Sequence, residues 1–166
     1  MKPKPFRPEP YNGQPNFIRD RSSGLIWHRS TYRTLYADTD RSEVVYHANY
    51  LRFFEFGRTS LMRDFGYPYK EIEAHGLVYP IIDLGIGFYS PLYYDDLMQI
   101  HTRPTHLERV RLQFDYLITQ AETGRIVCIG FTKHCALNSK GLPVAVDPQT
   151  VELWNSFPVI TGFKKI

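Results

Sequence analysis

The sequence predicts one α+β domain, on the basis of its length and of two kinds of hydrophobic periodicity. At 166 residues the chain is long enough for one domain with a core and too short for two of ordinary size. Between residues 47 and 65 apolar side chains recur at steps of three and four, which is typical of one helical face. Elsewhere apolar and polar side chains alternate, as they do in strands. One strand before a long helix and four connected strands after it form an α+β pattern.

The first strand is expected at residues 25–36 and the long helix at residues 47–65. The apolar side chains of the helix spread beyond one narrow stripe, so we expect the helix to be covered on several sides. Gly66 is placed to end it. A short helix is expected at residues 68–75, with Pro68 in its first turn.

Four strands are expected after these helices, near residues 82–88, 95–106, 110–118 and 127–135. The third shows the clearest alternation, since apolar residues occupy its even positions and polar residues most of its odd ones. A turn at residues 122–124 joins the last two strands. Asp147 is expected to cap a short helix whose first residue is Pro148.

The two ends of the chain are expected to lie outside the domain, which we place at residues 25–157. Residues 1–24 hold five of the twelve prolines and show no apolar periodicity. They cannot bury enough surface to fold alone, so we expect a disordered or loosely docked arm. The alternative is an arm that lies over a neighbouring subunit. Residues 158–166 are interpreted as a C-terminal tail.

Composition and charge argue against several classes of protein. The net charge of +3 is small and the signs are interspersed, which argues against a nucleic-acid-binding protein. No apolar run approaches the roughly 20 residues that span a membrane, and the basic start lacks the apolar core of a secretory signal. Cys128 and Cys135 face opposite sides of one expected strand and are poorly placed to pair. We therefore expect a cytoplasmic protein without membrane insertion.

The most informative stretch joins the first strand to the long helix. It contains Asp38-Thr39-Asp40, then Val44-Val45-Tyr46-His47-Ala48-Asn49-Tyr50, then Phe53-Phe54-Glu55. A carboxylate here lies beside a helix N-terminus, where free backbone N–H groups and the helix dipole attract developing negative charge. That arrangement suits the hydrolysis of a carbonyl compound. An Asp just before a helix is also a common cap or turn former, so position alone leaves both roles open.

This combination resembles the signature of the 4-hydroxybenzoyl-CoA thioesterase family, and within it the bacterial acyl-CoA thioesterases associated with the Tol-Pal system. The similarity extends from about Trp27 to about Trp154. It implies a hotdog fold, in which an antiparallel sheet wraps a central helix. It also implies hydrolysis of an acyl-CoA or aroyl-CoA thioester by a homodimer or homotetramer. No metal or redox cofactor is expected, since coenzyme A enters as part of the substrate.

The resemblance assigns roles to residues of the stretch. Asp40 matches the catalytic carboxylate, acting as general base or nucleophile. The backbone N–H of His47 matches the group that polarises the thioester carbonyl, and its imidazole is a second candidate group for orienting water or substrate. Asp38 is interpreted as a supporting residue that hydrogen-bonds the loop and holds Asp40 in place. The candidate substrate-binding residues are Tyr36, Tyr46 and Asn49.

The loop Arg41-Ser42-Glu43 departs from the family pattern, which usually has small residues, often glycine, before the paired valines. Glycine permits a positive φ and a close approach of the backbone, and Glu43 does neither as cheaply. We expect either a different path for the loop or an additional charge near the site.

Two other functions stay open. A hotdog dehydratase acting on a 3-hydroxyacyl thioester needs a histidine paired with a carboxylate across a subunit interface, and His47 is a candidate for it. A non-catalytic acyl-CoA-binding sensor would use the same pocket. A metal site is not expected, because the histidines and cysteines lack ligand spacing. The sequence has neither a G-x-S-x-G motif nor a glycine-rich phosphate loop.

Overall fold

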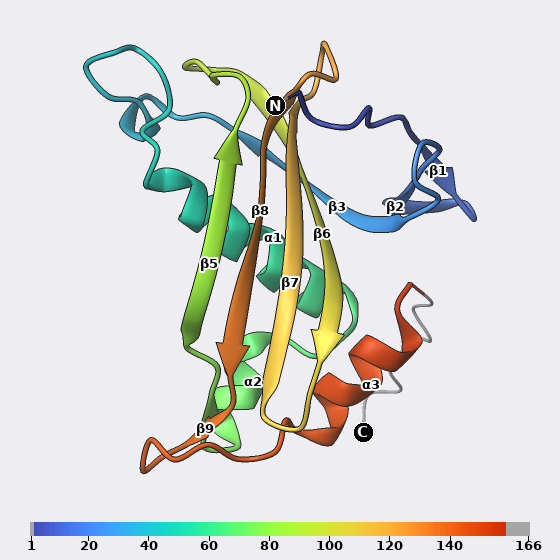
Figure 1. Cartoon of the computed structure of the whole chain (residues 1–166), viewed down its shortest axis with the longest axis vertical. Helices are drawn as coiled ribbons and strands as arrows, with labels where there is room; N and C mark the ends of the chain where they lie inside the picture. Colours follow the sequence, from blue (N-terminus) through green and yellow to red (C-terminus); the bar gives the residue numbers. More distant parts are fainter. Residues whose placement is uncertain (1, 159–166) are drawn as a thin grey trace.

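A computed structural model describes residues 2–158 and shows a seven-stranded antiparallel sheet packed against a long helix (Figure 1). The strand order is β1-β2-β3-β6-β7-β8-β5. The strands of this sheet are β1 (Pro8–Tyr11), β2 (Gln14–Asp20), β3 (Ile26–Arg33), β5 (Ile81–Phe88), β6 (Leu97–Leu107), β7 (Arg111–Gln120) and β8 (Ile126–Cys135). Two short strands, β4 (Leu77–Val78) and β9 (Leu137–Asn138), pair with each other. The helices are a 3-10 turn η1 (Tyr36–Asp38), α1 (Asn49–Asp64), α2 (Tyr69–Ala74) and α3 (Pro148–Ser156).

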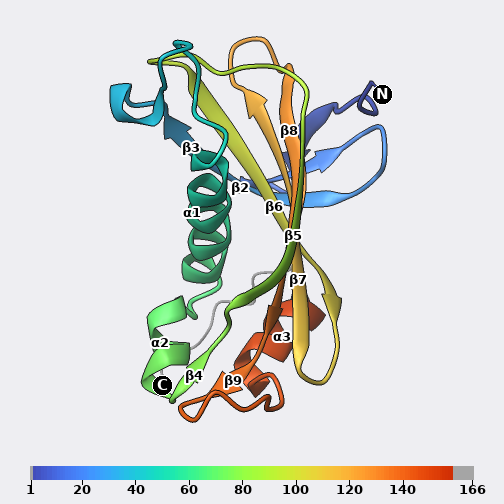
Figure 2. The same ribbon diagram turned by 60° about the vertical axis from the view of Figure 1, so that its left-hand side comes forward.

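Helix α1 lies on one face of the sheet, where the main core forms (Figure 2). The ring of Phe54 stacks on Tyr116 of β7 with centroids 4.1 Å apart. Gly57 brings the helix close to β6, because a Cβ at this position would lie 2.4 Å from Thr102 Oγ1. Helix α1 contacts β3, β6 and β7, and the even positions of β7 from 112 to 118 are buried as the alternation predicts. A long helix enclosed by an antiparallel sheet confirms the α+β class and the hotdog arrangement.

The expectation of a disordered or loosely docked N-terminal arm is wrong for residues 8–20. Strands β1 and β2 form a hairpin that extends the sheet beyond β3 and buries Phe17 and Ile18 on opposite faces. Asn12-Gly13 makes the turn, with φ of 47° and 67°. Two successive positive φ angles are what a tight hairpin turn requires, and Asn-Gly favours them. The prolines obscured this signal.

The segment before β1 runs over the face of the sheet turned away from α1 (Figure 2). Phe6 packs edge-on against His101 and Trp27, with centroid distances of 4.7 Å and 6.4 Å. It covers a small second core of Ile18, Trp27 and Leu117. The N-terminal segment is therefore docked on its own chain.

Several boundaries differ from those expected. Strand β3 ends at Arg33 rather than at Tyr36, because the chain turns into η1. Helix α1 begins at Asn49, two residues later than expected. Asp147 caps α3 as expected, since its side chain accepts a hydrogen bond from the Thr150 N–H at 2.9 Å. All but the first residue of the expected C-terminal tail lies outside the described residues. Within residues 2–158 no helix has both the length and the apolar character needed to cross a membrane.

Candidate active site

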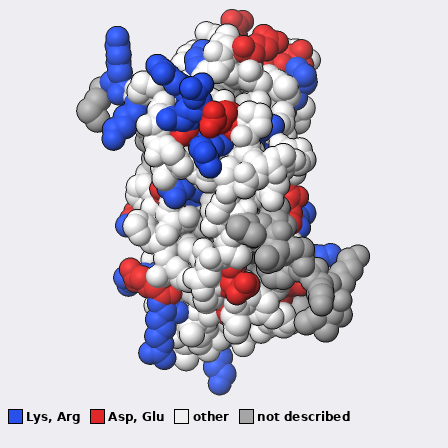
Figure 3. Space-filling view, turned by 90° about the vertical axis from the view of Figure 1, so that its right-hand side faces the viewer, with Lys and Arg blue, Asp and Glu red and all other residues white. Residues whose placement is uncertain are grey.

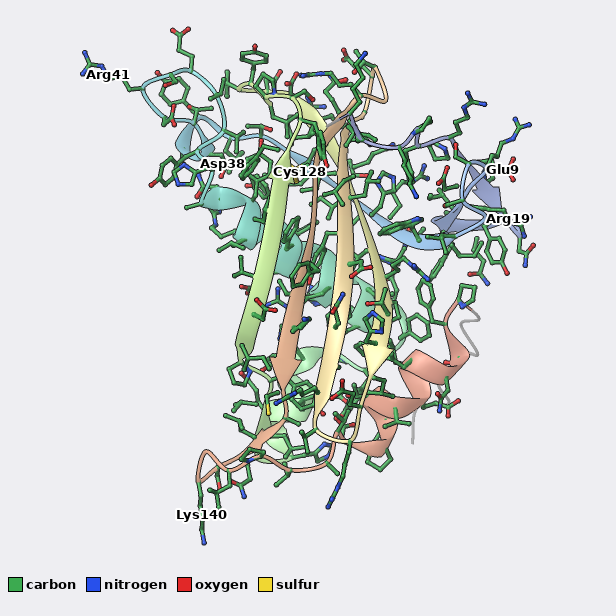
Figure 4. The ribbon with its side chains drawn as sticks, viewed as in Figure 1. Glu9, Arg19, Asp38, Arg41, Cys128 and Lys140 are labelled. Carbon is green, nitrogen blue, oxygen red and sulfur yellow. The ribbon has the colours of Figure 1, made fainter. Side chains whose placement is uncertain are left out.

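The loop between η1 and α1 is fastened by backbone hydrogen bonds on two sides. The Asp40 N–H donates to Val44 O at 3.0 Å, which closes the loop on itself. The Val45 N–H donates to Leu92 O at 2.9 Å, which ties the loop to the segment after β5. The base of the loop is therefore fixed, while Arg41 at its tip projects away from the body of the molecule (Figure 4).

The carboxylate of Asp38 is buried, with the residue only 1% exposed, and it accepts three hydrogen bonds. Its Oδ2 accepts from the Leu35 N–H at 2.8 Å and from the Tyr32 hydroxyl at 3.2 Å. Its Oδ1 accepts from Arg52 Nη1 on α1 at 3.2 Å. Burial raises the pKa of the Tyr32 hydroxyl and the negative charge of Asp38 raises it further, so the phenol remains a donor. Asp38 thereby joins β3, η1 and α1.

Asp40 differs from Asp38 in its environment, because Asp40 is exposed to solvent. Its Oδ1 accepts a hydrogen bond from the Ser42 N–H at 2.7 Å, and its backbone oxygen accepts one from the Glu43 N–H at 2.9 Å. The Oδ2 atom has no hydrogen-bond partner among residues 2–158. The two aspartates would share a side if the strand continued, but η1 separates them into a buried and a solvent-facing carboxylate.

Glu43 adopts the conformation for which glycine would be preferred. Its φ is +62°, in the left-handed region, and its side chain is exposed. For an L-residue other than glycine this conformation costs about 1–2 kcal/mol. The loop thus combines a strained backbone position with an added charge at its surface.

His47 lies two residues before α1, and Ala48 is the residue that caps the helix. Its side chain is exposed and its ring lies 4.4 Å from that of Tyr46. The His47 N–H has no acceptor among the described residues, as is common where a helix begins. The Tyr46 N–H donates to Asp38 O at 2.9 Å, so the segments that carry Asp40 and His47 run side by side.

The three candidate substrate-binding residues have different surroundings. Tyr36 is 79% exposed, and its ring meets that of Tyr94 edge-on at 5.5 Å. Tyr46 is partly exposed beside His47. The Asn49 side chain donates from Nδ2 to Asp38 O at 2.9 Å, so it binds the loop itself. Tyr36 and Tyr94 therefore form one exposed aromatic pair, and Tyr46 lies beside His47.

Sequence reasoning missed Arg52, Tyr32 and Tyr94, which complete this region. Arg52 lies 14 positions after Asp38 and Tyr94 lies 58 positions after Tyr36, so periodicity within one element does not reveal either contact. A buried carboxylate does require donors, and an arginine in the first turn of the following helix was a candidate. In the part of the chain that the structure describes, no three His, Cys, Asp or Glu side chains are grouped so that they would hold a metal ion.

Comparison with protein families matches residues 35–153 to the thioesterase-like superfamily. The chain belongs to this superfamily. The matched residues include the whole loop between η1 and α1, and they exclude the β1–β2 hairpin and β3.

Individual proteins resemble parts of the chain. YneP of Bacillus subtilis (strain 168) is 43% identical over 67 residues, which are 40% of this chain and about half, 49%, of YneP. The acyl-CoA thioester hydrolase YbgC of Escherichia coli O6:H1 is 32% identical over 90 residues, 54% of this chain and 67% of YbgC. The crystal structure of a DHNA-CoA thioesterase from Staphylococcus aureus has a TM-score of 0.74 at 25% identity, covering 78% of this chain and 89% of that chain.

Replacing Asp38 by asparagine is expected to destabilise the protein by about 1–3 kcal/mol, the usual effect of leaving buried hydrogen-bonding groups unpaired. An amide has one NH2 group, which must face either Arg52 or the pair of donors from Leu35 and Tyr32. Either orientation sets donor against donor. The measurement is the free energy of unfolding in urea.

Asp40→Asn is the matched control. Its side chain is exposed and its one hydrogen bond is a turn contact that asparagine also makes, so its free energy of unfolding should stay within about 0.5 kcal/mol of the original protein. Equal stability of the Asp38→Asn variant and this control would contradict the role of Asp38 in joining three elements.

Proposed function

We propose that this protein hydrolyses an acyl-CoA or aroyl-CoA thioester to the free acid and coenzyme A. The observation that carries the proposal is the presence of an exposed carboxylate with a free oxygen, Asp40, and a free backbone N–H, that of His47 two residues before α1, on adjacent segments of a chain of the thioesterase-like superfamily. A thioester hydrolase needs both a base or nucleophile for the carbonyl carbon and a donor for the carbonyl oxygen.

In the general-base route, Asp40 takes a proton from water while the water oxygen attacks the thioester carbon. The carbonyl electron pair moves onto oxygen, where the His47 N–H stabilises it; such a donor typically contributes about 3 kcal/mol. Collapse of this intermediate breaks the C–S bond, and the proton held by Asp40 passes to the leaving sulfur. In the nucleophilic route, Asp40 attacks the carbon itself, the C–S bond breaks and the coenzyme A thiolate leaves, taking a proton from water. A second water molecule then hydrolyses the resulting anhydride and restores the Asp40 carboxylate. Asp38 supports either route by fixing the start of the loop.

We also propose which type of thioesterase this protein is and where it is located in the cell. The motif between Asp38 and Glu55 favours the Tol-Pal-associated type within the 4-hydroxybenzoyl-CoA thioesterase family, and the similarity to the acyl-CoA thioester hydrolase YbgC supports an acyl-CoA substrate. Coenzyme A takes part as the leaving group of the substrate, and the carboxylate and backbone N–H perform the chemistry described above. A cytoplasmic location fits Cys128 and Cys135, which are buried free thiols.

We also propose a homodimer or homotetramer with the site at a subunit interface. The two edges of the sheet differ. Strand β1 has prolines at positions 8 and 10, which cannot donate backbone hydrogen bonds and therefore discourage pairing with another strand. Strand β5 has no proline and leaves Ile82, Leu84 and Phe88 between 42% and 51% exposed. A second copy of the chain would cover this apolar edge.

Release of free thiol from a panel of acyl-CoA esters tests the activity. Hydrolysis should be detected, with apolar or aromatic acyl groups such as butyryl or benzoyl preferred over charged ones such as malonyl, because Tyr46 lies exposed beside His47 and Tyr36 and Tyr94 form a second exposed aromatic pair. Water elimination from a 3-hydroxyacyl-CoA without thiol release would favour a dehydratase. Saturable acyl-CoA binding without either reaction would favour a sensor. Either of these two outcomes would refute the proposed hydrolase activity.

Light scattering tests the assembly. A chain of 19.5 kDa should give at least twice this mass at micromolar concentration. Leu84→Lys on the exposed face of β5 should lower the mass to that of one chain, since a charge in an apolar interface is unfavourable. An active protein that has the mass of one chain would rule out the interface site.

A further inference from the structure

The positive charge of the chain is concentrated in the first three strands and the segment before them. Residues 1–33 hold seven of the 20 Lys and Arg residues but only two of the 17 Asp and Glu residues. Residues 34–166 hold more acidic than basic side chains, so the net charge of +3 comes entirely from the N-terminal segment. The thioesterase-like match begins at residue 35, so this charge lies outside the matched residues.

Three exposed arginines share one face of the β1–β2 hairpin. Glu9 lies opposite Arg19 in the strand register. The Arg21 N–H donates to Arg7 O at 2.9 Å, which places these two arginines opposite each other. Opposed residues, and residues two apart along a strand, direct their side chains to the same face. Arg7, Arg19 and Arg21 therefore form one exposed surface around Glu9.

The acidic residues of the hairpin compensate this charge only in part. The carboxylate of Asp20 is buried, where it accepts hydrogen bonds from the Arg7 N–H at 2.8 Å and from the Ser23 hydroxyl at 2.6 Å. Glu9 lies 3.5 Å from Arg21, but both side chains are exposed and such a pair contributes little. The opposed side chains of Arg7 and Arg21 carry like charges, which destabilises a pair of strands. The stability of the hairpin does not account for this surface, which suits an external anion instead.

The segment before β1 adds two lysines to this surface. Lys2 and Lys4 are exposed, and the sequence of residues 1–8 contains no acidic side chain. Prolines at positions 3, 5 and 8 keep the backbone extended, and the ring contacts of Phe6 hold it on the sheet. On the face drawn in Figure 3, which looks onto the hairpin side of the molecule, basic side chains gather at the upper left.

We propose that the basic surface formed by Lys2, Lys4, Arg7, Arg19 and Arg21 docks the protein on an anionic phospholipid bilayer. Residues two apart in a strand lie about 7 Å apart, and an extended proline-rich segment adds about 3 Å per residue. The five charges are therefore spread too widely for one small anion, whereas an array of lipid phosphates can meet all of them. Clusters of about 4–8 Lys or Arg residues bind anionic bilayers, and each residue strengthens the binding about fivefold.

A bilayer fits this surface better than a nucleic acid does. Proteins that bind single strands stack the bases on exposed aromatic rings. The aromatic residue of this hairpin face, Tyr11, is instead covered by Arg19, whose guanidinium carbon lies 5.4 Å from the ring centroid. Residues 34–166 carry more acidic than basic side chains and would repel a long polyanion that wrapped round the molecule. A bilayer meets one side of the molecule only.

Docking through the basic surface leaves the candidate active site free. In Figure 1 the hairpin lies at the upper right and the loop between η1 and α1 at the upper left. Figure 4 shows Glu9 and Arg19 at one edge of the molecule and Arg41, from that loop, at the other. A bilayer on the hairpin side therefore does not cover Asp40. The inference does not depend on the proposed thioesterase activity.

Sedimentation of the full chain with lipid vesicles tests the proposal. Vesicles made of equal parts of phosphatidylcholine and phosphatidylglycerol should bind the protein at low ionic strength, whereas vesicles of phosphatidylcholine alone should not. Replacing Arg7, Arg19 and Arg21 together by glutamine should weaken the binding about 10²-fold, at about fivefold for each charge. Added salt should weaken the binding of the original protein, because it screens exposed charges.

The matched control replaces Lys70, Arg109 and Lys140 by glutamine, which removes the same charge from exposed side chains outside the hairpin. This variant should bind anionic vesicles within about fivefold of the original protein. The melting temperatures of both variants should match that of the original, since all six side chains are exposed. An equal loss of binding in the two variants would assign the binding to net charge alone and overturn the proposal.

Hydrogen exchange of the unmodified protein tests the same surface without a variant. Anionic vesicles should slow the exchange in residues 2–21 and leave residues 38–47 unchanged. Protection confined to other residues, or no binding to anionic vesicles, would overturn the proposal. Full displacement from the vesicles by a DNA duplex or by inorganic phosphate, at equal phosphate concentration and ionic strength, would also overturn it, because the surface would then prefer nucleic acid or a small anion.

Discussion

The geometry of the candidate site depends on the hydrogen bonds that the buried carboxylate of Asp38 accepts. This carboxylate accepts hydrogen bonds from Tyr32 on β3, from Leu35 at the start of η1 and from Arg52 on α1. A carboxylate taken out of water is stable only with such donors, so the three elements cannot separate without leaving a buried charge unpaired. The loop that carries Asp40 starts from this junction.

The rest of the site lies between this junction at Asp38 and the solvent. Backbone hydrogen bonds to Val44 and Leu92 fix the base of the loop, and Glu43 takes up a strained positive φ within it. Such a residue persists only where surrounding contacts determine its conformation, and the bonds on both sides of the loop provide them. Asp40 thus faces solvent from a fixed backbone, which is the arrangement that a base or nucleophile requires. On the face drawn in Figure 3, basic side chains gather at the upper left, acidic ones lie along the upper edge, and both signs occur in the lower half.

The sequence predicted those parts of the fold that depend on local periodicity. The long helix follows from apolar residues at steps of three and four, and strands β5 to β8 follow from side-chain alternation. The cap of α3 follows from Asp147 and Pro148. The β1–β2 hairpin was missed because its prolines outweighed the Asn12-Gly13 turn signal. The β4–β9 pair is too short for any periodicity. In the site, the contacts of Asp38 with Arg52 and of Tyr36 with Tyr94 depend on the folded chain, so no local pattern encodes them.

The rate of thioester hydrolysis by Asp40→Asn tests the central claim most directly. Asparagine keeps the size of the side chain and the turn contact to the Ser42 N–H, and it removes the negative charge. If Asp40 is the base or nucleophile, kcat should fall by roughly 10²–10⁴-fold while KM changes much less. A folded Asp40→Asn protein that retained more than about a tenth of the original kcat would contradict the account, because a loss below tenfold is too small for the group that performs the chemistry.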